Sequence, residues 1–258
     1  MSGLRAVASI VRRDWVRAFR QKGRLLGGLV RPFMWLILVG TGYNAIAHVQ
    51  GAGSYRAFLL PGLVVMASLF GAMLTAIGTV YDREFGMLRL MLASPAGVPA
   101  ILTGRALAAA LIGGLQGLIV LAFVPFAIQV SAWQLVFALL VLAVCSGASA
   151  VLGLLVAAPI RSVENFAGVI NVVLFPLLFS SGALYPTEGM PRALRILTAI
   201  NPVSYEVDLM RGALGLPAEF GLVRSLGALG FTIIAGFAAT VVLFDSEQRL
   251  AVKRRPAV

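Results

Sequence analysis

The residues best placed for chemistry form a short charged run between two long apolar segments. The run reads Asp82-Arg83-Glu84-Phe85-Gly86-Met87-Leu88-Arg89, in a chain of which only 12% of the residues are charged. These charges do not fit the hydrocarbon of a membrane, where each would cost roughly 2.5–3.5 kcal/mol at the centre. We therefore expect a helix over residues 82–94 at the aqueous surface. Phe85 and Leu88 are its expected apolar anchors for another protein.

Other chemistry-bearing patterns are nearly absent from the sequence. It has no G-x-x-x-x-G-K-[ST] motif, which would form a nucleotide-binding P-loop. The single histidine, His48, cannot build a Ser-His-Asp triad or a histidine-rich metal site. The membrane spans expected below contain no Asp, Glu or Lys, and intramembrane carboxylates are the usual carriers in proton-coupled transporters. We predict that the chain is not an enzyme, holds no metal and is not a proton-driven carrier.

The elements that position the charged run are membrane-spanning helices. Apolar residues make up 60% of the 258 residues, and the mean hydropathy is +0.95. Apolar stretches of about 20 residues recur, which is the length of a helix that crosses a bilayer. The sequence predicts an all-α integral membrane protein with a single domain, residues 1–258, in which Cys145 is a buried thiol. Six spans are expected, at residues 29–47, 58–80, 101–128, 133–157, 166–184 and 226–244.

The N-terminal segment, residues 1–24, is rich in arginine and has apolar residues at helical spacing. This pattern predicts an amphipathic helix in the plane of the lipid headgroups. A mitochondrial transit peptide, which is also rich in arginine, is the alternative. The net charge of +11 invites a nucleic-acid partner, but the arginines cluster at the ends of the spans, as the positive-inside rule requires. We expect no nucleic-acid binding.

The distribution of basic residues predicts the orientation. Most of the 21 Lys and Arg residues fall on one side if the N-terminus is cytoplasmic. The long 185–225 loop carries as many acidic as basic residues, Glu206 and Asp208 among them. We therefore expect both termini and the charged run in the cytoplasm, and the 185–225 loop outside.

The outer loop is predicted to contain a helical hairpin over residues 186–215. Helical apolar spacing on either side of Asn201-Pro202 indicates two short helices, because the residue before a proline is disfavoured in a helix. The pair fits a hairpin that dips into the membrane where protein covers its polar ends. It fits equally well two helices that lie flat on the outer surface.

Three motifs follow one another along the chain. They are residues 82–89, followed by Ala93-Ser94-Pro95; the run Ser181-Gly182-Ala183-Leu184-Tyr185-Pro186; and residues 201–212. In this order they resemble "E-x-G-T-L-E/R", "S-G-x-x-[FY]-P" and "N-P-L-T-Y-x-x-D-x-[LM]-R", which are motifs of the membrane subunits of ATP-binding-cassette exporters of the type-2 permease family. The first resembles the coupling helix of that family, with Met87 where threonine is frequent. The likeness covers nearly the whole chain, and the family includes drug, lipooligosaccharide and polysaccharide exporters.

The resemblance implies an exporter subunit in a bacterial inner membrane, working with a cytoplasmic ABC ATPase that binds the ATP and magnesium. A second permease copy, or a similar chain, and membrane lipid are the other implied partners. The alternative from a different class is a non-transporting scaffold or assembly protein. The site residues fall into four groups. They are Asp82, Arg83, Glu84, Phe85, Gly86, Leu88 and Arg89 for ATPase coupling; Arg161 and Glu164 for a secondary cytoplasmic contact; Asn44, Gln116 and Asn171 for the pathway lining; and Pro186, Asn201, Pro202, Tyr205, Asp208 and Arg211 in the outer hairpin.

Overall fold

The computed structural model describes residues 3–42, 55–92, 94, 96–187 and 189–253, and this part of the chain forms helices and no strand. The prediction of an all-α integral membrane protein is confirmed. In chain order the elements are α1 (Gly3–Arg20), α2 (Lys22–Met34), the π-helical turn η1 (Trp35–Val39), α4 (Tyr55–Glu84), α5 (Met87–Leu92), α6 (Val98–Leu121), the 3-10 turn η3 (Val124–Phe126), α7 (Ala132–Ala157), α8 (Val163–Phe179), α9 (Arg192–Ile200), α10 (Pro202–Ala213) and α11 (Leu222–Lys253).

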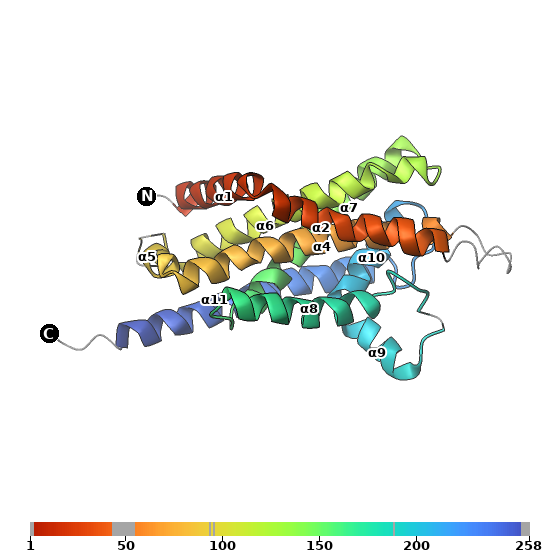
Figure 1. Cartoon of the computed structure of the whole chain (residues 1–258). Helices are drawn as coiled ribbons and strands as arrows, with labels where there is room; N and C mark the ends of the chain where they lie inside the picture. The colour runs from red at the N-terminus through yellow and green to blue at the C-terminus, as the bar shows by residue number, and fades with distance from the viewer. Residues whose placement is uncertain (1–2, 43–54, 93, 95, 188, 254–258) are drawn as a thin grey trace.

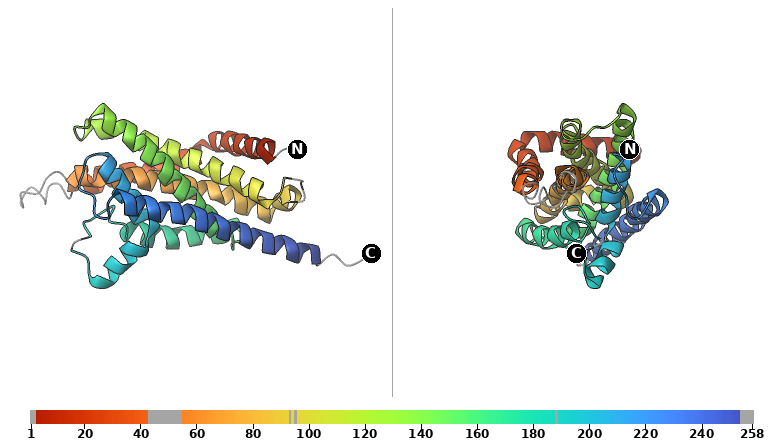
Figure 2. Two further views of the ribbon diagram at one scale, coloured as in Figure 1. Left: turned by 180° about the vertical axis from the view of Figure 1, so that it is seen from behind. Right: turned by 90° about the vertical axis from the view of Figure 1, so that its right-hand side faces the viewer.

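Helix α4 forms the centre of the bundle. Its residues from Leu59 to Met73 are almost all buried, and it packs against α6 and α7. Helices α2 and α11 lie at the periphery with most of their apolar surface exposed. Figure 1 shows α1, α5 and the end of α11 at one end of the bundle and α9 at the other, and Figure 2 shows the same arrangement from behind and from one end.

Glycines let α4, α6 and α7 approach closely. A Cβ atom added at Gly113 would lie 2.5 Å from the Ser68 carbonyl oxygen of α4. One added at Gly117 would meet Leu142 of α7 at 2.6 Å. Such small residues are typical of helix interfaces inside membranes, where close packing replaces the hydrophobic driving force. The two glycines therefore serve packing within the chain.

Among the residues that the structure describes, five helices are long and apolar enough to cross a membrane, and a sixth apolar helix is shorter. The shorter one is α8, with 17 residues, in the place of the predicted span 166–184. The predicted span 101–128 is interrupted after Leu121, because Pro125 falls in a separate 3-10 turn. Helix α11 extends to Lys253, well beyond the predicted end at residue 244. Asn44 and His48 lie outside the described residues.

The hairpin residues separate into an exposed helix and a buried one. Helix α9 is mostly exposed, whereas α10 packs among α4, α7 and α11 with most of its residues buried. Asn201 joins the two, since its side-chain oxygen accepts a hydrogen bond from the Val203 N–H and caps α10. Helix α10 therefore enters the bundle while α9 stays at its surface. Neither a hairpin that dips into the membrane as a whole nor a pair of helices lying flat describes both helices.

The other hairpin residues fix α10 to its surroundings. The Tyr205 hydroxyl donates to the Ala199 carbonyl at 2.6 Å. Asp208 accepts hydrogen bonds from the Phe220 N–H and from the Ser225 hydroxyl, which ties α10 to the start of α11. Arg211 donates to the Gly182 carbonyl at 2.7 Å in the turn after α8. Pro186 is exposed in the loop that follows that turn.

Candidate coupling site

The charged run is the end of one helix, a turn and the start of another, in place of the single helix predicted over 82–94. Helix α4 ends at Glu84, and α5 begins at Met87. Gly86 makes the turn with φ +77°, a left-handed conformation in which a Cβ atom would be strained. The run therefore presents its residues in different directions.

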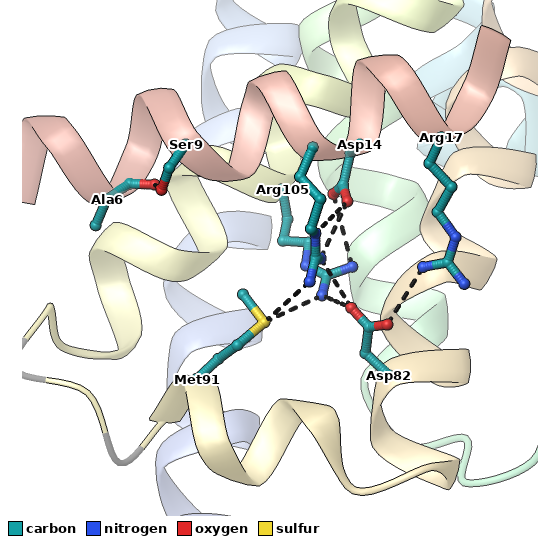
Figure 3. A network of polar contacts seen from close by, with 8 residues as sticks. Ala6, Ser9, Asp14, Arg17, Asp82, Met91 and Arg105 are labelled. Carbon is teal, nitrogen blue, oxygen red and sulfur yellow. Dashed lines mark hydrogen bonds and ion pairs between the residues drawn. The ribbon is translucent and has the colours of Figure 1, made fainter. Parts of the chain in front are cut away.

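Asp82 points into the molecule, where it joins three arginines from two other helices (Figure 3). Arg13 and Arg17 of α1 donate to its carboxylate at 2.8 and 3.2 Å. Arg105 of α6 forms a third ion pair with Asp82, and it also lies 3.7 Å from Asp14 of α1. Both carboxylates and Arg105 are buried, so each charge depends on the others for compensation.

Helix α5 contacts the same cluster through Met91. Its sulfur accepts hydrogen bonds at 3.6 Å from Arg13 and from Arg105. Burial lowers the pKa of Arg13, but Asp14 and Asp82 outweigh this effect and raise the pKa above its ordinary value. Helices α1, α4, α5 and α6 therefore meet at one cluster of ion pairs.

The next two residues of the run bind the facing ends of other helices. Arg83 donates to the carbonyls of Ala157 and Ile160 at 3.1 and 2.5 Å, where α7 ends. Its guanidinium group also lies 4.7 Å from the centre of the Phe244 ring of α11. The Glu84 carboxylate accepts a 2.8 Å hydrogen bond from the N–H of Val163, the first residue of α8. A cation at a helix C-terminus and an anion at an N-terminus are both favourable.

Three consecutive residues thus connect the end of α4 to five other helices. Asp82 reaches α1 and α6, Arg83 reaches α7 and α11, and Glu84 reaches α8. Sequence reasoning found these residues but expected their charges to face a partner protein. The hydrogen-bond partners named above are between 23 and 79 positions away, Phe244 is farther still, and nothing in the local pattern reveals them.

The outward side of this junction is an exposed apolar surface formed by Tyr81, Phe85, Met87 and Leu90, here called the coupling surface. Phe85 is 66% exposed and Leu90 is 70% exposed, and Arg89 beside them is exposed as well. The ring of Phe85 rests on Tyr81, with 4.4 Å between the ring centres. Large apolar side chains that remain exposed at an aqueous end of a protein mark a binding surface.

Leu88, predicted as an exposed anchor, lies inside the molecule. It is 3% exposed and packs with Val98 and Leu102 of α6 and with Phe244 of α11. The left-handed turn at Gly86 rotates the start of α5, so that Leu88 faces the bundle while Met87 and Leu90 face outward.

The predicted secondary contact lies beside the run. Arg161 and Glu164 are exposed on the segment that enters α8, and Glu84 binds Val163 between them. The structure therefore brings the two groups of predicted cytoplasmic residues together at one end of the bundle.

The polar residues expected in the pathway have different surroundings. Gln116 is buried and donates to the Leu25 carbonyl of α2 at 3.2 Å, which is a contact between helices. Asn171 is exposed on α8, and its side chain donates to the Ala167 carbonyl one turn earlier.

One buried carboxylate was assigned to the aqueous outer loop by sequence reasoning. Glu206 of α10 is fully buried, and the Ser149 hydroxyl of α7 lies 3.0 and 3.2 Å from its two oxygens. A signal for this burial exists in the sequence. Glu206 shares one helical face with Val203, Val207 and Met210, all of which are buried.

Comparisons with known proteins agree with the motifs. A family model described as ABC-2 type transporter matches residues 5–214. The transport permease ycf38 of Porphyra purpurea is 31% identical over 214 residues, covering 81% of this chain and 73% of that protein. Nodulation protein J of Rhizobium leguminosarum bv. trifolii is 30% identical over 243 residues, covering 89% and 92%. YbhR of Escherichia coli (strain K12), named as a multidrug ABC transporter permease, is 30% identical over 199 residues, covering 76% and 52%.

The matched range extends from α1 through the coupling surface to the end of the outer hairpin. It includes each of the three motifs on which the resemblance in the sequence rests. The chain therefore belongs to the ABC-2 type transporter family and is the membrane subunit of an ABC transporter.

Proposed function

We propose that this membrane subunit exports its cargo across a bacterial inner membrane, driven by a separate cytoplasmic ATPase that docks on the coupling surface. Both termini and the coupling surface then face the cytoplasm, as the distribution of basic residues predicts. ATP and Mg²⁺ bind to the partner ATPase and not to this chain. The cytoplasmic residues Arg161 and Glu164 lie close enough to the coupling surface to contact the same partner.

The observation that carries this proposal is the position of the coupling surface directly on the junction of helices. Phe85 follows Glu84 without a spacer, and Met91 of α5 contacts the ion-pair cluster. A force applied to the surface therefore reaches α1, α6, α7, α8 and α11 through direct polar contacts. Because packed helices shift as rigid bodies, closure of an ATPase pair would tilt several of them together.

A second copy of the chain, or a similar chain, is proposed to complete the pathway. Helix α8 exposes the apolar side chains of Val172, Phe175 and Phe179, and Asn171 lies among them. A polar amide on an otherwise apolar exposed face is better placed against protein or a pathway than against lipid. Asn171 thus remains the best candidate among the predicted lining residues, while α2 and α11 offer surface for lipid.

Co-purification with candidate soluble ABC ATPases tests the docking. The variant is Phe85→Ala/Leu90→Ala, and the control is Phe126→Ala, which is 87% exposed at the other end of α6. Removing two apolar anchors should weaken ATPase binding roughly tenfold or more. It should also reduce stimulated ATP hydrolysis in lipid, whereas the control should bind and hydrolyse like the wild type. If the double variant binds normally, the docking surface lies elsewhere. If no ABC ATPase binds the wild-type chain, a scaffold function takes precedence.

A further inference from the structure

A basic groove lies between α1 and the junction of α4 with α5. Its volume is about 700 Å³, and it is lined by Arg12, Arg13, Arg17 and Arg20 of α1 together with Asp82 and Met87. Arg13, Arg17 and Arg20 follow one another at spacings of four and three residues, which places them on one helical face. The groove is open on one side and large enough for a phosphate and its polar substituents.

The charge of the groove is not balanced within the described part of the chain. Asp82 is already bound by Arg13, Arg17 and Arg105, so its negative charge is shared among three cations. Arg12 and Arg20 are exposed, and neither has a hydrogen bond or ion pair with the described residues. The groove therefore holds a surplus of positive charge with free guanidinium donors, which suit a phosphate group.

The surroundings of the groove indicate which anion it takes. The first span begins at Leu25, five residues after Arg20, so the groove lies where the chain enters the membrane. Val16 and Phe19 of α1 are exposed close to the arginines, and Trp15 packs on Phe19 with 5.0 Å between ring centres. Arginines beside exposed aromatic and aliphatic side chains are typical of helices that bind anionic lipid surfaces.

We infer that this groove binds the headgroup of an anionic phospholipid. The phosphate pairs with Arg12 and Arg20, while Arg13 and Arg17 bind Asp82 and hold α1 in place. The acyl chains lie along the exposed Val16 and Phe19. An acidic segment of a soluble partner would use the arginines but leave these apolar side chains in water. The inference depends on the membrane location of the chain and not on transport.

The test measures the affinity of the full-length detergent-purified protein for phosphatidylglycerol, by native mass spectrometry and by the rise in melting temperature on lipid addition. The variant Arg12→Ala/Arg20→Ala removes the two free cations and no contact within the fold. The control, Arg5→Ala/Arg192→Ala, removes the same charge from exposed positions outside the groove. We expect roughly 30-fold weaker binding for the groove variant and less than a twofold change for the control.

Each other outcome overturns the inference in a distinguishable way. Equal loss in the control would show an effect of net charge alone. If zwitterionic phosphatidylcholine binds as tightly as phosphatidylglycerol, the groove does not recognise the negative charge of the headgroup. Competition by inorganic phosphate at the concentration of the lipid would assign the site to a free anion. Unchanged lipid binding together with lost ATPase co-purification would assign it to an acidic protein segment. The lipid-binding readouts do not depend on docking at the coupling surface, so failure of that docking leaves them unchanged.

Discussion

At the scale of single residues, two buried carboxylates have opposite surroundings. Asp82 is bound by three arginines, whereas Glu206 is bound by the hydroxyl of Ser149 and forms no ion pair with the described residues. The sequence predicted a functional role for Asp82 because its charge interrupts an apolar region. It gave no indication that the side chain faces inward, since the arginines that bind it lie on α1 and α6.

The Asp82 cluster leads to a prediction about stability. Asp82→Asn leaves Arg13, Arg17 and Arg105 close together without this carboxylate, and breaking a buried ion pair costs about 3–5 kcal/mol. We expect a clear fall in the melting temperature of the purified protein in detergent. Glu164→Gln removes an exposed carboxylate on the same side of the bundle and should leave the melting temperature nearly unchanged. Equal stability of Asp82→Asn and the wild type would contradict the structural role of the cluster.

At the scale of the elements, the sequence predicted most helices but not their ends. The hydropathy pattern located the apolar segments, and Asn201-Pro202 located the break in the outer hairpin. The break at Gly86 was missed because one glycine in a helical pattern is compatible with a continuous helix. The depth of α10 was also missed, because burial depends on whether α4, α7 and α11 leave room for it.

Two adjacent glycines of α6 test the packing of the elements. Gly113→Ala places a methyl group 2.5 Å from the Ser68 carbonyl, so α4 and α6 must separate, at a cost of about 1–3 kcal/mol. Gly114→Ala makes an ordinary contact, 3.4 Å from the Ser146 hydroxyl, and should be neutral or slightly stabilising. Thermal unfolding of both variants in the same detergent gives the comparison. Equal melting temperatures would show that α4 and α6 do not pack this closely.

At the scale of the whole molecule, the motifs predicted the family, and the family model and the relatives confirm it.

The orientation in the membrane stays a prediction. Figure 1 shows α5 and α9 at opposite ends of the bundle, so a thiol on each reports one side. In inside-out vesicles an impermeant maleimide should modify Leu90→Cys and not Ile200→Cys, with the reverse in right-side-out vesicles. The opposite pattern would place the coupling surface outside and exclude docking of a cytoplasmic ATPase there.

The burial of Cys145 makes such labelling simple. It is the only cysteine of the sequence, and its sulfur lies inside the bundle, 3.7 Å from the backbone carbonyl of Glu206. A reagent in water does not reach this thiol while the bundle stays folded. The native chain is therefore the unlabelled control for each cysteine variant. Spin labels and fluorophores can then be attached at single chosen positions without first replacing a native residue. Slow labelling of the native chain would in turn report the opening of α7 from α10.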